Sequence, residues 1–140
     1  MDFMQEYEKW LRSPALSPAE HAELEAIRND PKEIESRFFG PLEFGTAGLR
    51  GTMYTGLHNM NIHVIRWATQ GFANVICAEG EEAKRRGVDL GMDCRNHSME
   101  FARAAAEVCA ANGIHVRIFE SLRPTPELSC LLYTSPSPRD

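Results

Sequence analysis

Residues 88–119, VDLGMDCRNHSMEFARAAAEVCAANGIHVRIF, decide the fold class of this sequence. Val88–Asp93 is expected to form a strand that is buried on both faces of a sheet. A helix follows, with Ser98 as its N-cap. Apolar and polar side chains then alternate over residues 114–119, which is the pattern of a second strand. A strand, a helix and a strand in so short a stretch predict a βαβ unit with parallel strands, so the fold class is α/β.

The βαβ unit also predicts where a ligand would bind, because ligands of open α/β sheets lie beyond the carboxyl ends of the strands. Residues 93–98 follow the first strand, and residues 121–126 follow the second. Each loop contains an arginine together with hydroxyl or amide groups suited to phosphate. The alternative is that Asp93 and Ser98 only cap the helix and that Arg95 is an ordinary solvated side chain.

A glycine-rich segment, EFGTAGLRG at residues 43–51, lies upstream of this unit. Its glycines stand at every third position, including Gly48, and they let the backbone approach a ligand and expose N–H groups. Thr46 adds a hydroxyl, and Arg50 adds a planar, permanently charged group that fits phosphate in a bidentate manner. The segment has neither the ending of a Walker loop nor the spacing of a dinucleotide fingerprint. A glycine-rich turn without a ligand remains the alternative.

The charge of the chain is unevenly distributed around this segment. The 20 acidic and 15 basic residues give a net charge of −5, yet no Asp or Glu occurs between Glu43 and Glu79. That acid-free stretch contains Arg50 and Arg66. It favours an anion site, because a nearby carboxylate would repel the ligand. A buried helix and loop with no room for acids would give the same composition.

The remaining segments are expected to be helical and structural. Residues 1–40 contain three helix starts, with Asp2, Ser17-Pro18-Ala19-Glu20 and Asp30-Pro31 as the capping sequences. A longer helix follows the glycine-rich segment. We expect Asn61 to cap it, Phe72 to lie on its buried face and Trp67 to anchor a core.

Composition excludes several classes of function. The acidic balance argues against a general nucleic-acid binder, which needs basic charge to displace counterions. No apolar run approaches the roughly 20 residues that span a bilayer, and the N-terminus has no secretory signal. The four cysteines have no C-x-x-C spacing, which indicates free thiols in a reducing compartment. We therefore expect a cytoplasmic protein with no nucleic-acid or membrane partner.

Several motifs in series resemble those of the α-D-phosphohexomutase family. They are FGTAGLRG at 44–51, MNIHVIRWATQG at 60–71, GMDCRNHS at 91–98 and LRPTPELS at 122–129. The likeness is strongest to the phosphopentomutase-like branch of the phosphoglucomutases and phosphomannomutases. It implies a three-layer α/β/α domain I that is incomplete, in residues 41–129, preceded by a helical extension in residues 1–40.

The resemblance also implies an activity. Members of the family are isomerases of carbohydrate metabolism that move a phosphoryl group within a sugar, interconverting hexose 1-phosphate and hexose 6-phosphate through a phosphoserine and a sugar bisphosphate. The implied site residues are Thr46, Gly48 and Arg50 in a phosphate-binding loop, supported by Asp93, Arg95 and Thr125. The implied cofactor of the full-length protein is Mg²⁺, and the implied substrate is a hexose phosphate or a pentose phosphate.

This sequence departs from the family in its last part. The phosphoserine loop of the family, Thr-Ala-Ser-His-Asn-Pro, does not occur, so we expect an N-terminal fragment with no catalytic residue, no metal site and no mutase activity of its own. Residues 130–140 back-translate into a transposase-type sequencing adapter, and they are expected to be a non-native, disordered tail. Two alternatives stay open. One is a free-standing α/β module that binds sugar phosphates without catalysis, and the other is an unrelated nucleotide-binding domain.

Overall fold

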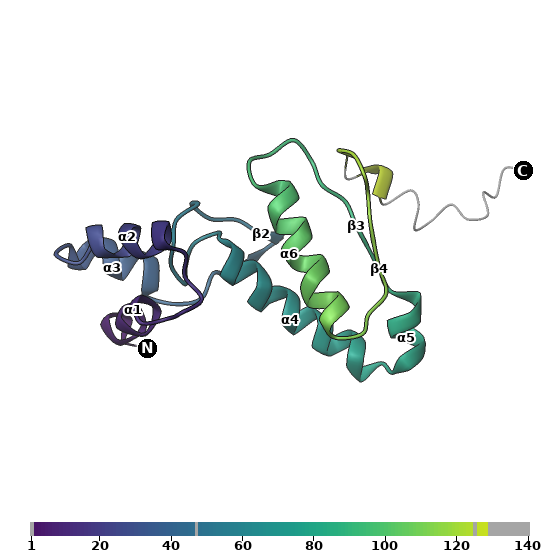
Figure 1. The fold of residues 1–140 in the computed structure, drawn as a ribbon, viewed down its shortest axis with the longest axis horizontal. Helices are drawn as coiled ribbons and strands as arrows, with labels where there is room; N and C mark the ends of the chain where they lie inside the picture. Colours follow the sequence, from purple (N-terminus) through teal and green to yellow (C-terminus); the bar gives the residue numbers. More distant parts are fainter. Residues whose placement is uncertain (1, 47, 125, 129–140) are drawn as a thin grey trace, which may run out of the picture. The chain divides into compact units, whose positions relative to one another are not determined.

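The computed structural model describes residues 2–46, 48–124 and 126–128 (Figure 1). The chain divides into two compact units, residues 1–64 and 65–140. The boundary between them falls inside a long helix, α4 (Ile62–Ala78). The expected domain boundary after residue 40 stays a prediction, and the expected tail at 130–140 lies outside the described residues.

Three short helices begin the first unit: α1 (Phe3–Leu11), α2 (Pro18–Ala26) and α3 (Pro31–Phe38). Each begins at its predicted cap, where the side chain of Asp2, Ser17 or Asp30 accepts hydrogen bonds from N–H groups of the first turn. The helices share one apolar cluster, whose buried members are Tyr7, Leu16, Leu24, Ile34, Phe38 and Leu57. Because Leu57 belongs to this cluster, the loop before α4 packs on the helical extension.

The glycine-rich segment forms a short antiparallel hairpin of β1 (Phe44–Gly45) and β2 (Gly48–Leu49), with Phe44 opposite Leu49. The sequence predicted only a glycine-rich loop here. Gly48 has a φ of +100°, a conformation that L side chains rarely adopt. The reversal of the chain between the two strands therefore explains why glycine stands at this position.

The second unit contains the predicted βαβ arrangement. Its elements after α4 are α5 (Glu81–Arg86), β3 (Val88–Leu90), α6 (Ser98–Ala111) and β4 (Val116–Ile118). Strands β3 and β4 pair in parallel, with Val88 opposite Val116. Ala73 of α4, Cys109 of α6 and Ile114 form the buried cluster of this unit. No helix in the described part of the chain is long and apolar enough to cross a bilayer.

Two burial predictions in this unit are wrong. The strand at β3 is not buried on both faces, because Asp89 pairs with Arg117 of β4 at 2.5 Å and so places an ion pair on one face. On α4, Trp67 and Phe72 are exposed by 58% and 55%, whereas Ala73 is fully buried. The helix is apolar on more than one side, and its spacing alone does not decide which side packs.

Candidate functional site

The hairpin presents the side chains of the predicted phosphate-binding loop to solvent. Thr46 lies between β1 and β2, and Arg50 follows β2 directly; both are exposed. Gly48, whose φ is positive, lies between them in the chain. The hydroxyl and the guanidinium are therefore accessible on one short turn of backbone, as an anion site requires.

Carboxylates from other parts of the chain approach the acid-free stretch at several points. Arg66 donates to Glu107 at 2.9 Å, and Nε2 of His63 lies 3.0 Å from Glu20. Arg50, in contrast, joins none of the ion pairs, defined by an N–O distance of 4.0 Å or less, in the part of the chain that the structure describes. Because the exposed guanidinium of Arg50 joins no such pair, it can bind a phosphate without first breaking one.

The two loops at the carboxyl ends of β3 and β4 lie side by side, as the sequence predicted. The N–H of Phe119 donates to the carbonyl of Leu90 at 3.1 Å, and the N–H of Arg123 donates to the carbonyl of Met92 at 2.9 Å. Backbone pairing therefore continues beyond the ends of the two strands. It brings the two loops that follow β3 and β4 to the same edge of the sheet.

Asp93 and Arg95 form a local pair in the first of these loops. Asp93 accepts the backbone N–H of Arg95 at 3.1 Å, and its other carboxylate oxygen lies 3.2 Å from Nε of Arg95. The hydrogen bond from the Arg95 backbone is the largest of the effects that hold the pKa of Asp93 below its usual value. The guanidinium of Arg95 remains on the surface.

The expectation that Asp93 and Ser98 cap α6 is wrong. The N-cap position belongs to His97, which has a φ of +61° and makes no side-chain capping bond. The hydroxyl of Ser98 instead accepts the N–H of Asp93 at 3.1 Å. The Ser98 side chain therefore closes the loop before the helix, and it shapes the segment that carries Asp93 and Arg95.

The predicted site residues fall in both units. Thr46, Gly48 and Arg50 lie in the first unit, Asp93 and Arg95 lie in the second, and Thr125 lies outside the described residues. Among the described residues there is no group of three or more His, Cys, Asp or Glu side chains that could hold a metal ion. The described residues therefore do not fit a Mg²⁺ site.

A buried arginine that contacts the loop before α4 was not among the predicted residues. Arg37 of α3 is only 6% exposed, and its guanidinium donates to Glu33 at 2.8 Å and to Glu23 at 2.5 Å. The sequence did contain a signal for it. Arg37 stands three residues after the buried Ile34 and so falls on the apolar face of α3, where a charge needs a partner.

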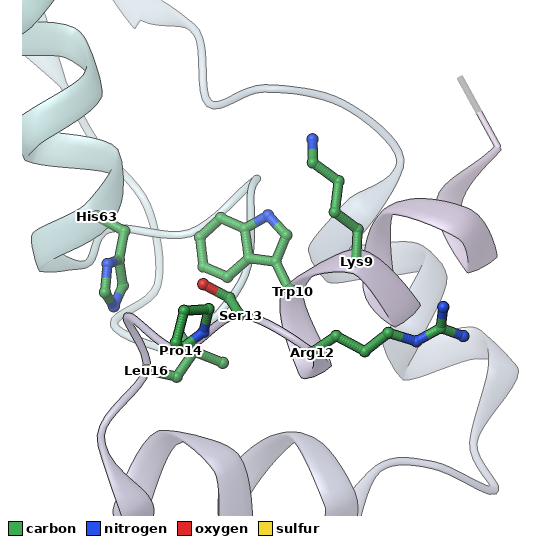
Figure 2. Close-up of a pocket in the computed structure, with 7 residues that line it drawn as sticks. All are labelled: Lys9, Trp10, Arg12, Ser13, Pro14, Leu16 and His63. Atoms are coloured by element: carbon green, nitrogen blue, oxygen red, sulfur yellow. The ribbon is translucent and has the colours of Figure 1, made fainter.

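An open pocket of about 390 Å³ lies in the first unit. Its lining residues are Lys9, Trp10, Arg12, Ser13, Pro14, Leu16 and His63. Figure 2 shows that the charged ends of Lys9 and Arg12 extend away from His63. The rings of Trp10 and His63 meet edge to face at 5.7 Å. We assign this pocket a structural role, since the contact holds α1 against the first turn of α4.

Glu20 should make the stability of the first unit depend on pH. Burial raises its pKa, but hydrogen bonds from the backbone and hydroxyl of Ser17 and the contact with His63 outweigh this effect, so the pKa is lowered. A carboxyl whose pKa is lower in the folded protein stabilises it above the unfolded pKa, about 4.3. That contribution is lost as the pH falls through the folded pKa.

We therefore expect the free energy of unfolding to fall less steeply between pH 6 and pH 3 in Glu20→Gln than in the wild type. Urea titrations at each pH measure this slope. Glu25→Gln is the matched control, because Glu25 lies on the same helix as Glu20 but makes only an exposed ion pair, with Arg28 just after that helix. Identical slopes in the wild type and in Glu20→Gln would contradict the assignment.

Comparison with known proteins places these features in a family. A family model described as phosphoglucomutase/phosphomannomutase, alpha/beta/alpha domain I, matches residues 41–135. The chain belongs to this family. The α/β/α description confirms the predicted fold class, and the helices and strands of the described residues form an incomplete phosphoglucomutase/phosphomannomutase domain I.

Curated relatives of known name agree with this family. The phosphopentomutase of Homo sapiens is 36% identical over 129 residues, which cover 87% of this chain and 21% of the relative. The phosphomannomutase of Mycoplasma pneumoniae is 32% identical over 122 residues, covering 86% of this chain and 22% of the relative. The phosphoglucomutase of Staphylococcus saprophyticus is 35% identical over 98 residues, covering 70% of this chain and 17% of the relative. The chain spans about a fifth of the length of these relatives, and no solved structure matches it.

Proposed function

We propose that this chain is the N-terminal part of a phosphosugar mutase. The full-length protein would interconvert hexose 1-phosphate and hexose 6-phosphate through a phosphoserine and a sugar bisphosphate. The observation that carries the proposal is the match of residues 41–135 to domain I of the family. The relatives named phosphopentomutase support a pentose phosphate as a second candidate substrate. The full-length protein would be cytoplasmic and would bind Mg²⁺ through residues outside the described part of this chain.

In this proposal the hairpin of the first unit binds a phosphoryl group. Phosphoryl transfer depends on positioning and on cations that neutralise charge on the phosphoryl oxygens. Arg50 supplies such a cation, since its guanidinium is exposed and joins no ion pair among the described residues. Thr46 adds a hydrogen bond from its hydroxyl. Asp93 and Arg95 have a supporting role, which is to fix the shape of their own loop.

Arg50→Ala should weaken phosphate binding by the chain. We expect inorganic phosphate to shift the ¹H–¹⁵N signals of residues 44–51 in the wild type, with millimolar affinity, and we expect Arg50→Ala to weaken it about tenfold or more. The matched control is Arg66→Gln, from the same acid-free stretch, because Arg66 is already paired with Glu107. Phosphate binding that survives Arg50→Ala would remove Arg50 from the site.

The same samples test whether the chain alone is a mutase. The phosphoserine-loop sequence of the family does not occur in it, so we expect no conversion of glucose 1-phosphate to glucose 6-phosphate. A coupled assay for glucose 6-phosphate measures this directly. Turnover by the purified chain would show that the chemistry uses residues other than those of the family's phosphoserine loop.

A further inference from the structure

A partly buried ion-pair network at Arg37 joins the helical extension to the loop between the hairpin and α4. Glu23 of α2 accepts hydrogen bonds from the Arg37 guanidinium at 2.5 Å, from the Thr55 hydroxyl at 2.6 Å and from the Thr55 N–H at 3.2 Å. Thr55 is 3% exposed. The guanidinium also lies over the ring of Tyr54, with 4.4 Å between its central carbon and the ring centroid. One carboxylate thus holds an arginine of α3 and a threonine of the loop together.

The backbone of this loop is fitted closely to α3. The N–H of His58 donates to the carbonyl of Arg37 at 2.8 Å. A Cβ at Gly56 would lie 2.9 Å from the Arg37 Cβ and 3.0 Å from the Arg37 carbonyl oxygen. Glycine is therefore needed at position 56 for the loop to approach the helix, and the loop cannot shift along α3 without losing these contacts.

From this loop, hydrogen bonds lead to both sides of the hairpin. The N–H of Leu42, just before the hairpin, donates to the carbonyl of Leu57 at 3.2 Å. After the hairpin, the carbonyl of Thr52 accepts the N–H of Met60 at 2.8 Å, and its hydroxyl donates to Asn59 at 2.9 Å. Both ends of the segment that contains Arg50 are thereby tied to the loop.

An isolated two-stranded hairpin is marginally stable in water, so its position depends on such ties. An ion pair away from solvent adds little net stability over an apolar pair of the same shape, and in some proteins its role is instead to specify one geometry. The network at Arg37 suits the role of fixing one geometry of the loop. Arg37 is buried, and Glu23 accepts hydrogen bonds through both of its carboxylate oxygens.

We infer that Glu23, Arg37 and Thr55 are positioning residues for the phosphate-binding hairpin, and that the helical extension is a working part of the phosphate site. This inference rests on the proposed function for the role of Arg50. It assigns the extension a task beyond stability, because α2 and α3 hold the loop that fixes both ends of residues 43–51.

The test compares two substitutions at one position. Thr55→Val keeps the shape of the side chain and removes the hydroxyl that donates to Glu23, while Thr55→Ser keeps the hydroxyl. We expect Thr55→Val to speed amide exchange at Leu42 and Met60 about tenfold, since a hydrogen bond to a charged group is among the stronger ones. We expect phosphate affinity to fall at least about fivefold in Thr55→Val. Thr55→Ser should keep both the slow amide exchange and the phosphate affinity of the wild type.

A control separates positioning from general destabilisation. Tyr7→Phe removes a hydrogen bond of 3.0 Å from the Tyr7 hydroxyl to the carbonyl of Leu24, which belongs to the same helical cluster but not to the contacts of Glu23, Arg37 and Thr55. It should lower stability and leave exchange at Leu42 and Met60, relative to that of Ile34 in α3, unchanged. Unchanged exchange at Leu42 and Met60 in Thr55→Val would overturn the inference.

The two readouts also separate this inference from the proposed function. Faster exchange in Thr55→Val, in a chain whose wild type binds no inorganic phosphate, would support positioning of the hairpin and contradict the phosphate site. Phosphate binding that is equal in the wild type and Thr55→Val would support the site and contradict the positioning role. Loss of both properties in Thr55→Val, restored by Thr55→Ser, supports the two together.

Discussion

Replacing Gly87 by alanine should break the pairing of β3 with β4 and lower the free energy of unfolding by about 3 kcal/mol or more. Gly87 has a φ of +75°, and a Cβ built on it would lie 2.1 Å from the carbonyl oxygen of His115. That oxygen accepts the N–H of Val88 at 2.8 Å. It cannot move away from the new methyl group without breaking the hydrogen bond that begins the parallel pair.

Gly113→Ala is the matched control for this prediction. Gly113 has a nearly equal φ of +73°, but a Cβ there would meet nothing within 4 Å. Its substitution should cost only the backbone strain, about 1–2 kcal/mol. Urea unfolding gives the two values, and amide exchange at Val88 shows whether the strand pair opens. Equal losses would mean that the positive φ, rather than the approach of His115, requires glycine at position 87.

The sequence predicted the local features of the fold well, because they depend on residues close together in the chain. The caps at Asp2, Ser17 and Asp30 need only a polar side chain and the N–H groups of the next turn. The cap at Asn61 is also confirmed, since its side chain accepts the N–H of Val64 at 3.0 Å. The parallel pairing of β3 and β4 followed from a strand, a helix and a strand of the right lengths.

Features that depend on distant residues were missed. Glu23 and Thr55 are 32 positions apart, and no local spacing brings them together. Serine is a common helix N-cap, yet the hydroxyl of Ser98 accepts a hydrogen bond from the N–H of Asp93, five residues earlier. Phe72 lies on a helix with apolar residues on more than one side, so the choice of the buried side depends on what packs there. For the candidate site, Arg50 stays a prediction from the sequence, and only the structure shows that it joins no ion pair among the described residues.

Phe38→Ala should be the most damaging single truncation in the helical extension. The Phe38 side chain has no exposed surface, and its ring meets the rings of Tyr7 and Trp10 edge to face, with centroids 5.7 Å apart in both pairs. Removing it takes away the burial of the ring and leaves a cavity between α1 and α3, which costs about 3–5 kcal/mol. A small domain is stable by only about 5–15 kcal/mol, so a large part of the stability of this unit would be lost.

The neighbouring residue provides the control for that prediction. Phe39 has the same side chain but is 53% exposed, and its ring lies against the ring of His58, with 4.0 Å between the centroids. Phe39→Ala should therefore cost less than about 1 kcal/mol. Composition does not distinguish the two phenylalanines, whereas the geometry of α3 does, because Phe38 follows Ile34 by four residues on the buried face. A larger loss of unfolding free energy in Phe39→Ala than in Phe38→Ala would show that α3 is rotated about its axis from the position described. Arg37 would then also lose its hydrogen bonds to Glu23 and Thr55.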